Sequence, residues 1–224
     1  MLIQFEKNRS MLESMLEAGV HFGHQVGRWN PKMAPYIYEE KNGIHILDLV
    51  QTVRDLEKAR QALQRANNVL FVGTKPQIAP LIATTAEKCN AHYVNTRWIG
   101  GLLTNWTTMS MCLQKLNTLD NQLANDPQSQ GFSKKEVLML KKQRDRLDKF
   151  FGGLRNLKTL PDLVVIVGQP NERNAVAECQ KLGIPTITLL DSNCDPTCVE
   201  YGIPANDDST RSVEFILQRL AGAN

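Results

Sequence analysis

Apolar and polar positions follow one another along this chain as they do in proteins that alternate strands with helices. Three continuous apolar runs predict strands buried on both faces, at residues 69–72, 163–167 and 185–190. Shorter strands are predicted at 44–47 and 92–94, and helices with one apolar face at 49–63, 78–88, 172–182 and 209–220. This alternation predicts an open parallel sheet with helices on both faces. The expected fold class is α/β, with a doubly wound parallel sheet of the flavodoxin or Rossmann kind.

An N-terminal extension precedes this pattern. Ser10 and Glu13 have the spacing of a capping box, which predicts a short helix from Ser10 to a glycine stop at Gly19. Asp48 and Gln51 predict the start of the following helix. Residues 21–36 show no clear periodicity, and we expect a loop there.

The alternation stops between residues 107 and 157, where no strand is predicted. Two sets of apolar residues there have helical spacing: Cys112, Leu116, Leu119 and Leu123, then Val137, Leu140, Leu147 and Phe151. Between them, residues 125–131 predict a turn, with proline and glycine in it. We expect an antiparallel helical hairpin of coiled-coil type at 107–157, inserted into an α/β domain formed by 1–106 and 158–224.

The charge is concentrated in this hairpin. The whole chain of 224 residues has 26 Lys+Arg and 23 Asp+Glu, a net charge of +3 that indicates no particular partner. Residues 132–158 contain nine basic and three acidic side chains, a net charge of +6, so the rest of the chain carries −3. This concentration has two explanations, a solvated helix face or an arm that binds phosphates.

Composition excludes several classes of protein. Hydrophobic residues at 42% and charged residues at 22% are typical of a globular chain. Five dispersed cysteines with no CxxC pair predict free thiols in a reducing compartment. We recognise no signal or transit peptide, and no apolar run approaches the roughly 20 residues of a membrane span.

Two groups of residues suggest chemistry at the ends of the predicted strands. Lys75 follows the strand at 69–72, but the spacing of glycines there differs from that of a phosphate-binding loop, so we expect Lys75 to contact a phosphate backbone rather than a nucleotide.

Four aspartates near strand ends could bind Mg²⁺ or act as acid and base: Asp191, Asp195, Asp207 and Asp208. Aspartate is commoner at turns and caps, and 207–209 are expected to cap the last helix.

Two further segments have a structural and a functional interpretation. His21 and His24 have a spacing that metal sites use, but Gly19 and Gly23 disfavour a regular helix there, and packing roles are the default. Residues 97–106 combine an arginine, two tryptophans and a Gly-Gly pair. They are the hinge of the hairpin, a loop whose glycines allow another backbone to approach closely, or both at once.

Residues 98–106 also strongly resemble the signature of bacterial and chloroplast-type small-subunit ribosomal protein S two. Further segments match that family in the same order: 17–24, 28–33, 43–49, 151–154, 160–162, 182–185, 191–196 and 203–208. The resemblance implies a non-catalytic component of the small ribosomal subunit that contacts ribosomal RNA and neighbouring ribosomal proteins, including the large S-one-type protein. It implies no enzyme activity, no membrane, no small-molecule substrate and no cofactor, apart from structural Mg²⁺ that accompanies RNA.

Residues 193–196 and 204–208 look most similar to the cyanobacterial and chloroplast members. We therefore expect a plastid-encoded chloroplast protein, with a bacterial or cyanobacterial cytoplasm as the alternative. Residues 168–171 depart from the family pattern, which puts contacts at that strand end in doubt.

RNA contacts are expected at matched positions whose side chains suit phosphate, sugar or base. They are His21, His24, Arg28, Trp29, Asn30, Lys32, Lys75, Arg97, Gly100, Gly101, Thr104, Asn105, Lys134, Lys135, Lys141, Lys142, Arg144, Arg146 and Arg155. The cations would neutralise phosphates, Thr104 and Asn105 would bind phosphate or sugar, and Trp29 would stack on a base. Two alternatives stay open: an α/β enzyme or binding protein with a sugar-phosphate or nucleotide pocket at the strand ends, and a module whose hairpin binds another protein.

Overall fold

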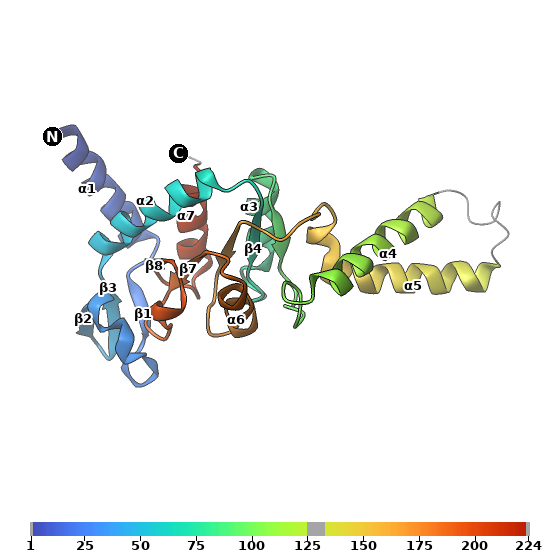
Figure 1. The fold of residues 1–224 in the computed structure, drawn as a ribbon. Helices are drawn as coiled ribbons and strands as arrows, with labels where there is room; N and C mark the ends of the chain where they lie inside the picture. Colours follow the sequence, from blue (N-terminus) through green and yellow to red (C-terminus); the bar gives the residue numbers. More distant parts are fainter. Residues whose placement is uncertain (1, 125–132, 223–224) are drawn as a thin grey trace.

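A five-stranded parallel sheet forms the centre of the molecule (Figure 1). In this computed structural model, residues 2–124 and 133–222 are described, with side chains from residue 9 onward. The strands lie in the order β5 (His92–Val94), β4 (Val69–Val72), β6 (Leu163–Ile166), β7 (Thr186–Leu190) and β8 (Tyr201–Pro204). Every neighbouring pair is parallel. The α/β fold with a parallel sheet is therefore confirmed. After β4, the next strand β5 is added on one side of β4, and the later strands β6, β7 and β8 are added on the other side, so the order of the strands reverses between β4 and β6.

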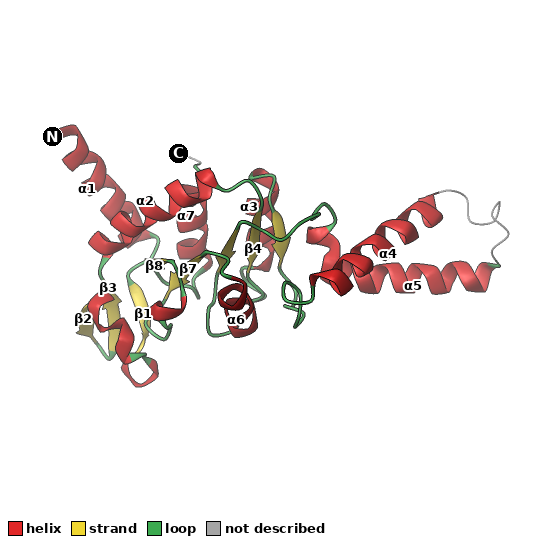
Figure 2. Cartoon of the chain, in the orientation of Figure 1, coloured by secondary structure: helices red, strands yellow, loops and turns green. Residues whose placement is uncertain are grey.

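Helices cover both faces of the sheet (Figure 2). The buried residues form one core with α2 (Leu49–Arg65), α3 (Ala79–Lys88) and α7 (Thr210–Leu220). A second core lies on the opposite face, with α6 (Arg173–Leu182) and the base of the hairpin. Alternate residues of β4 enter the two cores, because neighbouring side chains of a strand point to opposite faces.

A smaller antiparallel sheet lies at the N-terminal end of the domain, in the order β1 (Phe22–Gln25), β3 (Ile44–Leu47) and β2 (Ile37–Lys41). Only β3 was predicted, since the largely exposed, mixed residues of β1 and β2 have no apolar alternation. Strand β8 was also missed, because a short segment with glycine and proline lacks the apolar run of the other central strands.

The first helix, α1 (Leu2–Glu17), corrects one prediction. Ser10 lies inside α1 instead of capping it, and Glu13 pairs with Arg9 at 3.2 Å. The preceding residues continue the helix, so the capping-box spacing is wrong as a start signal here. The predicted stop holds, because the helix ends just before Gly19, which has a φ of 73°. Asp48 caps α2 as predicted, accepting a hydrogen bond from the Val50 amide at 2.9 Å.

The hairpin consists of α4 (Trp106–Ala124) and α5 (Lys134–Phe151), and it projects away from the sheet, at the end opposite β1–β3 (Figure 1). Leu116 and Leu119 are buried in α4. Ser133 and Glu136 form a capping box at the start of α5, with both reciprocal hydrogen bonds present. The turn predicted at 125–131 lies outside the described residues.

Candidate nucleic-acid interface

The outer face of α5 is the most basic surface of the hairpin. Six exposed cations lie within about 140° of the helix circumference, since successive residues are about 100° apart. They are Lys134, Lys135, Lys141, Lys142, Arg146 and Lys149. Among the described residues, none of the six forms an ion pair or a side-chain hydrogen bond, although the Lys149 ammonium lies 5.9 Å from the centre of the Phe150 ring. Their charge is therefore available to a partner.

The remaining two arginines of the hairpin have acidic partners. Arg155 donates to Asp148 at 2.6 Å and also to Asp120 of α4, so it ties the two helices together at their base. Arg144 lies 3.3 Å from Asp145 and 3.9 Å from Asp120. Both were predicted to bind RNA, but in the structure they neutralise the carboxylates of the hairpin. The uncompensated charge is therefore concentrated on the outer face of α5.

The loop that precedes α4 is organised by Glu178, a buried residue of α6. One carboxylate oxygen accepts from the Trp98 indole at 2.9 Å and the Gly101 amide at 2.8 Å. The other accepts from the amides of Leu103 at 2.9 Å and Thr104 at 3.0 Å, and from the Thr104 hydroxyl at 3.1 Å. Burial raises the pKa of Glu178, but these hydrogen bonds outweigh it and the pKa is lowered. The polar groups that we expected to meet RNA at Gly101 and Thr104 are thus used inside the protein.

Other parts of this loop remain exposed. Gly100 faces open space, and Arg97 and Asn105 are exposed. The hydroxyl of Thr96 donates to the backbone carbonyl of Lys149 at 2.9 Å. Because Arg97 follows Thr96, its backbone lies beside the C-terminal end of the basic face of α5. The structure thus brings together Arg97 and the cations of α5, two groups that were predicted to bind RNA.

The predicted contacts of residues 21–32 lie at the other end of the molecule (Figure 1). Arg28 and Trp29 are exposed, and Arg28 has no ion pair among the described residues. Asn30 accepts from the Lys32 amide at 3.1 Å. The Lys32 ammonium donates to Asp195 at 2.6 Å, although its side chain is still 53% exposed. The predicted residues thus form two separate regions rather than one continuous site.

His24 and Lys75 belong to a charge cluster that joins the two sheets. His24 Nδ1 lies 2.8 Å from Asp191 and Nε2 lies 3.2 Å from Asp208. Lys75 Nζ donates to Asp207 at 2.7 Å and to Asp208 at 2.8 Å, and its side chain is 12% exposed. Lys75 is therefore engaged within the protein instead of standing free at the sheet edge.

Neighbouring charges set the pKa values in this cluster. The hydrogen bond to Asp191 raises the pKa of His24. Burial lowers the pKa of Lys75, but the two carboxylates outweigh it and the pKa is raised. Burial, together with the charge of Asp191, raises the pKa of Asp207 to about 6. Of residues 207–209, which were predicted to cap α7, Ser209 occupies the N-cap position, but its side chain forms no capping hydrogen bond. The side chain of Asn206 instead accepts from the amides of residues 208 and 209, at 2.8 and 3.0 Å.

The crevice between β4 and β6 is closed by the chain itself. Parallel α/β proteins bind ligands at such a point, where the order of strand addition reverses. Here Thr74 donates both its amide and its hydroxyl to Glu172, which is 2% exposed. A Cβ on Gly168 would come within 3.1 Å of the Lys75 side chain, so the space is filled. This arrangement gives no support to a nucleotide or sugar-phosphate pocket at the switch point.

The two histidines considered for a metal face different surroundings. The rings of His21 and Phe22 lie 4.0 Å apart, and burial lowers the pKa of His21. Within the described residues, no group of three or more His, Cys, Asp or Glu side chains is arranged to hold a metal ion. The same part of the chain contains no helix that is both long and apolar enough to cross a membrane.

Several structural partners were not predicted. Glu172 and Glu178 look like ordinary polar residues of a helix, and their partners lie 98 and about 75–80 positions earlier in the chain.

One exposed cation was also not predicted. Arg173, at the start of α6, is exposed and has no ion pair among the described residues. The distribution of charge along the chain gives no signal for it, because Glu172 precedes it.

The fold and the charge distribution define a class of protein: an α/β protein whose crevice at the switch point is filled and whose projecting helical arm carries unpaired cations. A family model described as Ribosomal protein S2 matches residues 15–224. The chain belongs to the ribosomal protein S2 family.

Individual relatives agree with this assignment. The chain is 73% identical over 223 residues to small ribosomal subunit protein uS2c of Ostreococcus tauri, covering 98% of this chain and 99% of that protein. It is 50% identical over 221 residues to uS2 of a Picosynechococcus species, covering 95% and 84% of the two chains. It is also 50% identical over 216 residues to uS2c of Porphyra purpurea, covering 95% and 89%.

Membership in this family confirms three predictions. The chain is a structural, non-catalytic constituent of the small ribosomal subunit, where it assembles with ribosomal RNA and other ribosomal proteins in translation. The enzyme alternative has no support. The similarity to the algal uS2c proteins confirms the chloroplast assignment.

Proposed function

We propose that the outer face of α5 binds the phosphate backbone of small-subunit ribosomal RNA. The observation that carries the proposal is the separation of charges within the hairpin. Six cations on one face of α5 have no acidic partner among the described residues, while Arg144 and Arg155 neutralise Asp120, Asp145 and Asp148. A helix face with unpaired cations suits phosphates, which repeat along a nucleic acid and need no particular sequence.

Two other exposed groups add to the proposed contacts, one beside this surface and one apart from it. Arg97 lies at the base of the hairpin, beside the end of α5, and is suited to a phosphate of the same RNA segment. Arg28 and Trp29 come shortly after β1, which lies at the end of the molecule opposite the hairpin (Figure 1), and there they would contact a second segment of RNA. The groups already engaged inside the protein, such as His24, Lys75 and Thr104, support these surfaces without touching RNA. The less basic remainder is left for protein neighbours, and the protein needs no cofactor beyond Mg²⁺ that accompanies RNA.

The experiment compares two variants in which the same amount of positive charge is removed. One combines Lys134→Ala, Lys141→Ala and Lys142→Ala on α5. The matched control combines Arg65→Ala, Lys88→Ala and Lys181→Ala, which are exposed positions on α2, α3 and α6. Affinity for duplex fragments of small-subunit ribosomal RNA is measured over a range of salt concentrations.

For the α5 variant, the slope of log affinity against log salt should fall by about 0.9 for each phosphate that the protein no longer neutralises. The control should keep nearly the wild-type slope. An unchanged slope for the α5 variant contradicts the proposal. If that variant binds RNA normally but fails to enter the assembled subunit, the face binds a protein instead, and the proposal is wrong.

A further inference from the structure

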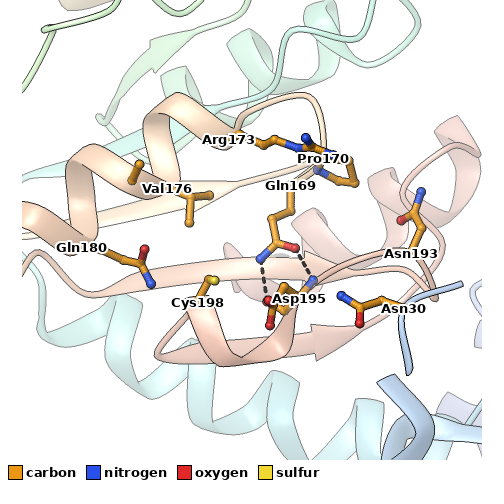
Figure 3. Close-up of a pocket in the computed structure, with 10 residues that line it drawn as sticks. Asn30, Gln169, Pro170, Arg173, Val176, Gln180, Asn193, Asp195 and Cys198 are labelled. Carbon is orange, nitrogen blue, oxygen red and sulfur yellow. Dashed lines mark hydrogen bonds between the residues drawn. The ribbon is translucent and has the colours of Figure 1, made fainter. Parts of the chain in front are cut away.

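A hollow beside α6 has no role in the fold or in the basic face of the hairpin. Its volume is about 360 Å³, and it is open to solvent. Its walls come from three segments of the chain, at Asn30, at residues 169–180 and at residues 193–198 (Figure 3). We propose that this hollow receives one unstacked nucleotide of single-stranded ribosomal RNA, an inference that rests on the proposed RNA-binding function.

The floor of the hollow is preformed. Gln169, which is 6% exposed, donates to the Asp195 carbonyl at 2.8 Å and accepts from the Asp195 amide at 2.6 Å (Figure 3). The carboxylate of Asp195 is neutralised by Lys32, whose hydrogen bond lowers the pKa of Asp195 to about 2. Little reorganisation is therefore needed before a ligand enters, which favours binding.

Hydrogen-bonding groups on the walls are left unused. Gln180 and Arg173 are exposed, and neither side chain has a hydrogen bond or ion pair among the described residues. The oxygen of the Asn30 side chain accepts from Lys32, and no described residue accepts from its amide nitrogen. Asn193 is already engaged, with its nitrogen 3.2 Å from His24. The available groups are thus two carboxamides and one guanidinium.

This combination fits a nucleotide by the chemistry of each part. Pro170, Val176 and Cys198 provide apolar surface against which a base can lie. The Gln180 carboxamide offers a donor and an acceptor, and Asn30 offers its amide nitrogen as a donor, so together they can pair with the edge of a base. The guanidinium of Arg173 can bind the adjoining phosphate.

The same features disfavour other ligands. A phosphate-binding loop is a common way of holding a free nucleotide, and the crevice between β4 and β6, where such a loop would lie, is filled by Lys75 and Glu172. Among the described residues that line the hollow, Arg173 carries the unpaired charge, and this charge is positive. A positive charge favours a chain that bears phosphates over a peptide with few acidic residues. Bases that are read individually in RNA come from single-stranded loops and bulges.

The first experiment uses the full chain with single-stranded RNA oligonucleotides that carry 4-thiouridine. Irradiation should produce cross-links to residues of the hollow, found by mass spectrometry within 169–180 or 193–198. An oligonucleotide that is abasic at the cross-linked position should bind more weakly. Cross-links found only elsewhere, or equal binding of the abasic oligonucleotide, overturn the proposal.

A second experiment separates this proposal from the one for α5. Arg173→Ala with Gln180→Ala should weaken binding of the single-stranded oligonucleotide by about tenfold or more, since the loss of even one well-placed contact to a base has about that effect. The matched control is Arg65→Ala with Gln64→Ala, two exposed α2 residues without described partners, and should change binding less than about twofold.

The duplex RNA used for α5 should bind the Arg173 and Gln180 variant normally. The triple α5 variant, in turn, should retain cross-links in the hollow. Equal reductions in binding for the hollow variant and its control would overturn the nucleotide site while leaving the α5 interface standing. A normal salt slope for the triple α5 variant would contradict that interface alone.

Discussion

The indole Nε1 of Trp98 donates a hydrogen bond of 2.9 Å to the carboxylate of Glu178, across 80 positions of the chain. Trp98 lies just before α4, and Glu178 lies in α6, on the body of the domain. Together with its bonds to Gly101, Leu103 and Thr104, this contact fixes the segment from which the hairpin projects. The donors of residues 98–104 thus bind the carboxylate of Glu178, an anion of the protein itself, where we had expected some of them to bind a phosphate of RNA.

Glu178→Gln should therefore destabilise the protein by about 2–4 kcal/mol, because it removes a charged acceptor and turns an NH₂ donor toward other donors. Urea unfolding measures the change in the free energy of unfolding. Glu87→Gln, at an exposed position of α3, is the control and should change it by less than about 0.5 kcal/mol. Equal effects of the two substitutions would show that Glu178 does not organise the loop.

The return of the hairpin to the domain depends on close packing at Gly153. A Cβ there would overlap the backbone carbonyl oxygen of Tyr93 and would lie 2.6 Å from the Tyr93 ring. Gly153→Ala should cost about 2–3 kcal/mol, because backbone cannot move aside cheaply. Gly100→Ala, where a Cβ would meet nothing within 4 Å, should be nearly neutral in thermal unfolding. A stable Gly153→Ala protein would contradict this packing.

The parts of the fold that the sequence predicted are those with a local signal. Strands β4 and β6 are apolar throughout because both faces are buried, so their runs stand out. The helices of the hairpin have apolar residues at helical spacing. By contrast, β2 is a largely exposed edge strand of the small sheet, and its residues carry no comparable pattern.

The candidate site was predictable as a concentration of charge but not as an arrangement of partners. The outer face of α5 follows from residue spacing alone. Whether a cation is free depends on contacts across the fold: Lys75 meets Asp207 from 132 positions away, and Arg155 meets Asp120 from 35. The sequence alone therefore does not show which of the predicted cations have acidic partners within the protein.

The ion pair between Arg155 and Asp120 should stabilise the base of the hairpin only modestly, because both side chains are about one-third exposed. A double-mutant cycle with Arg155→Ala and Asp120→Ala should give a coupling free energy of about 1 kcal/mol, decreasing in 1 M salt. The pair Arg9–Glu13, which is far more exposed, is the comparison and should give about 0.3 kcal/mol. Coupling energies of equal size would show that the hairpin pair has no special role.

The contact of His24 with Asp191 and Asp208 makes stability depend on pH in a defined direction. The folded pKa of His24 is raised above its usual 6.5, so protonation favours the folded state. The stabilisation from His24 is full below about pH 6.5 and is lost as the pH rises through the raised pKa. The difference in free energy of unfolding between wild type and His24→Ala should therefore be larger at about pH 5.5 than at pH 8.5.

His92 provides a control of opposite sign, since burial lowers its pKa below 6.5. The unfolded chain then takes up the proton more readily than the folded one as the pH falls below 6.5. The difference between wild type and His92→Ala should accordingly be smaller at about pH 5.5 than at pH 8.5. Urea titrations of the three proteins at both pH values measure the two differences. If both changed in the same direction, the carboxylates around His24 would not be the source of its pH dependence.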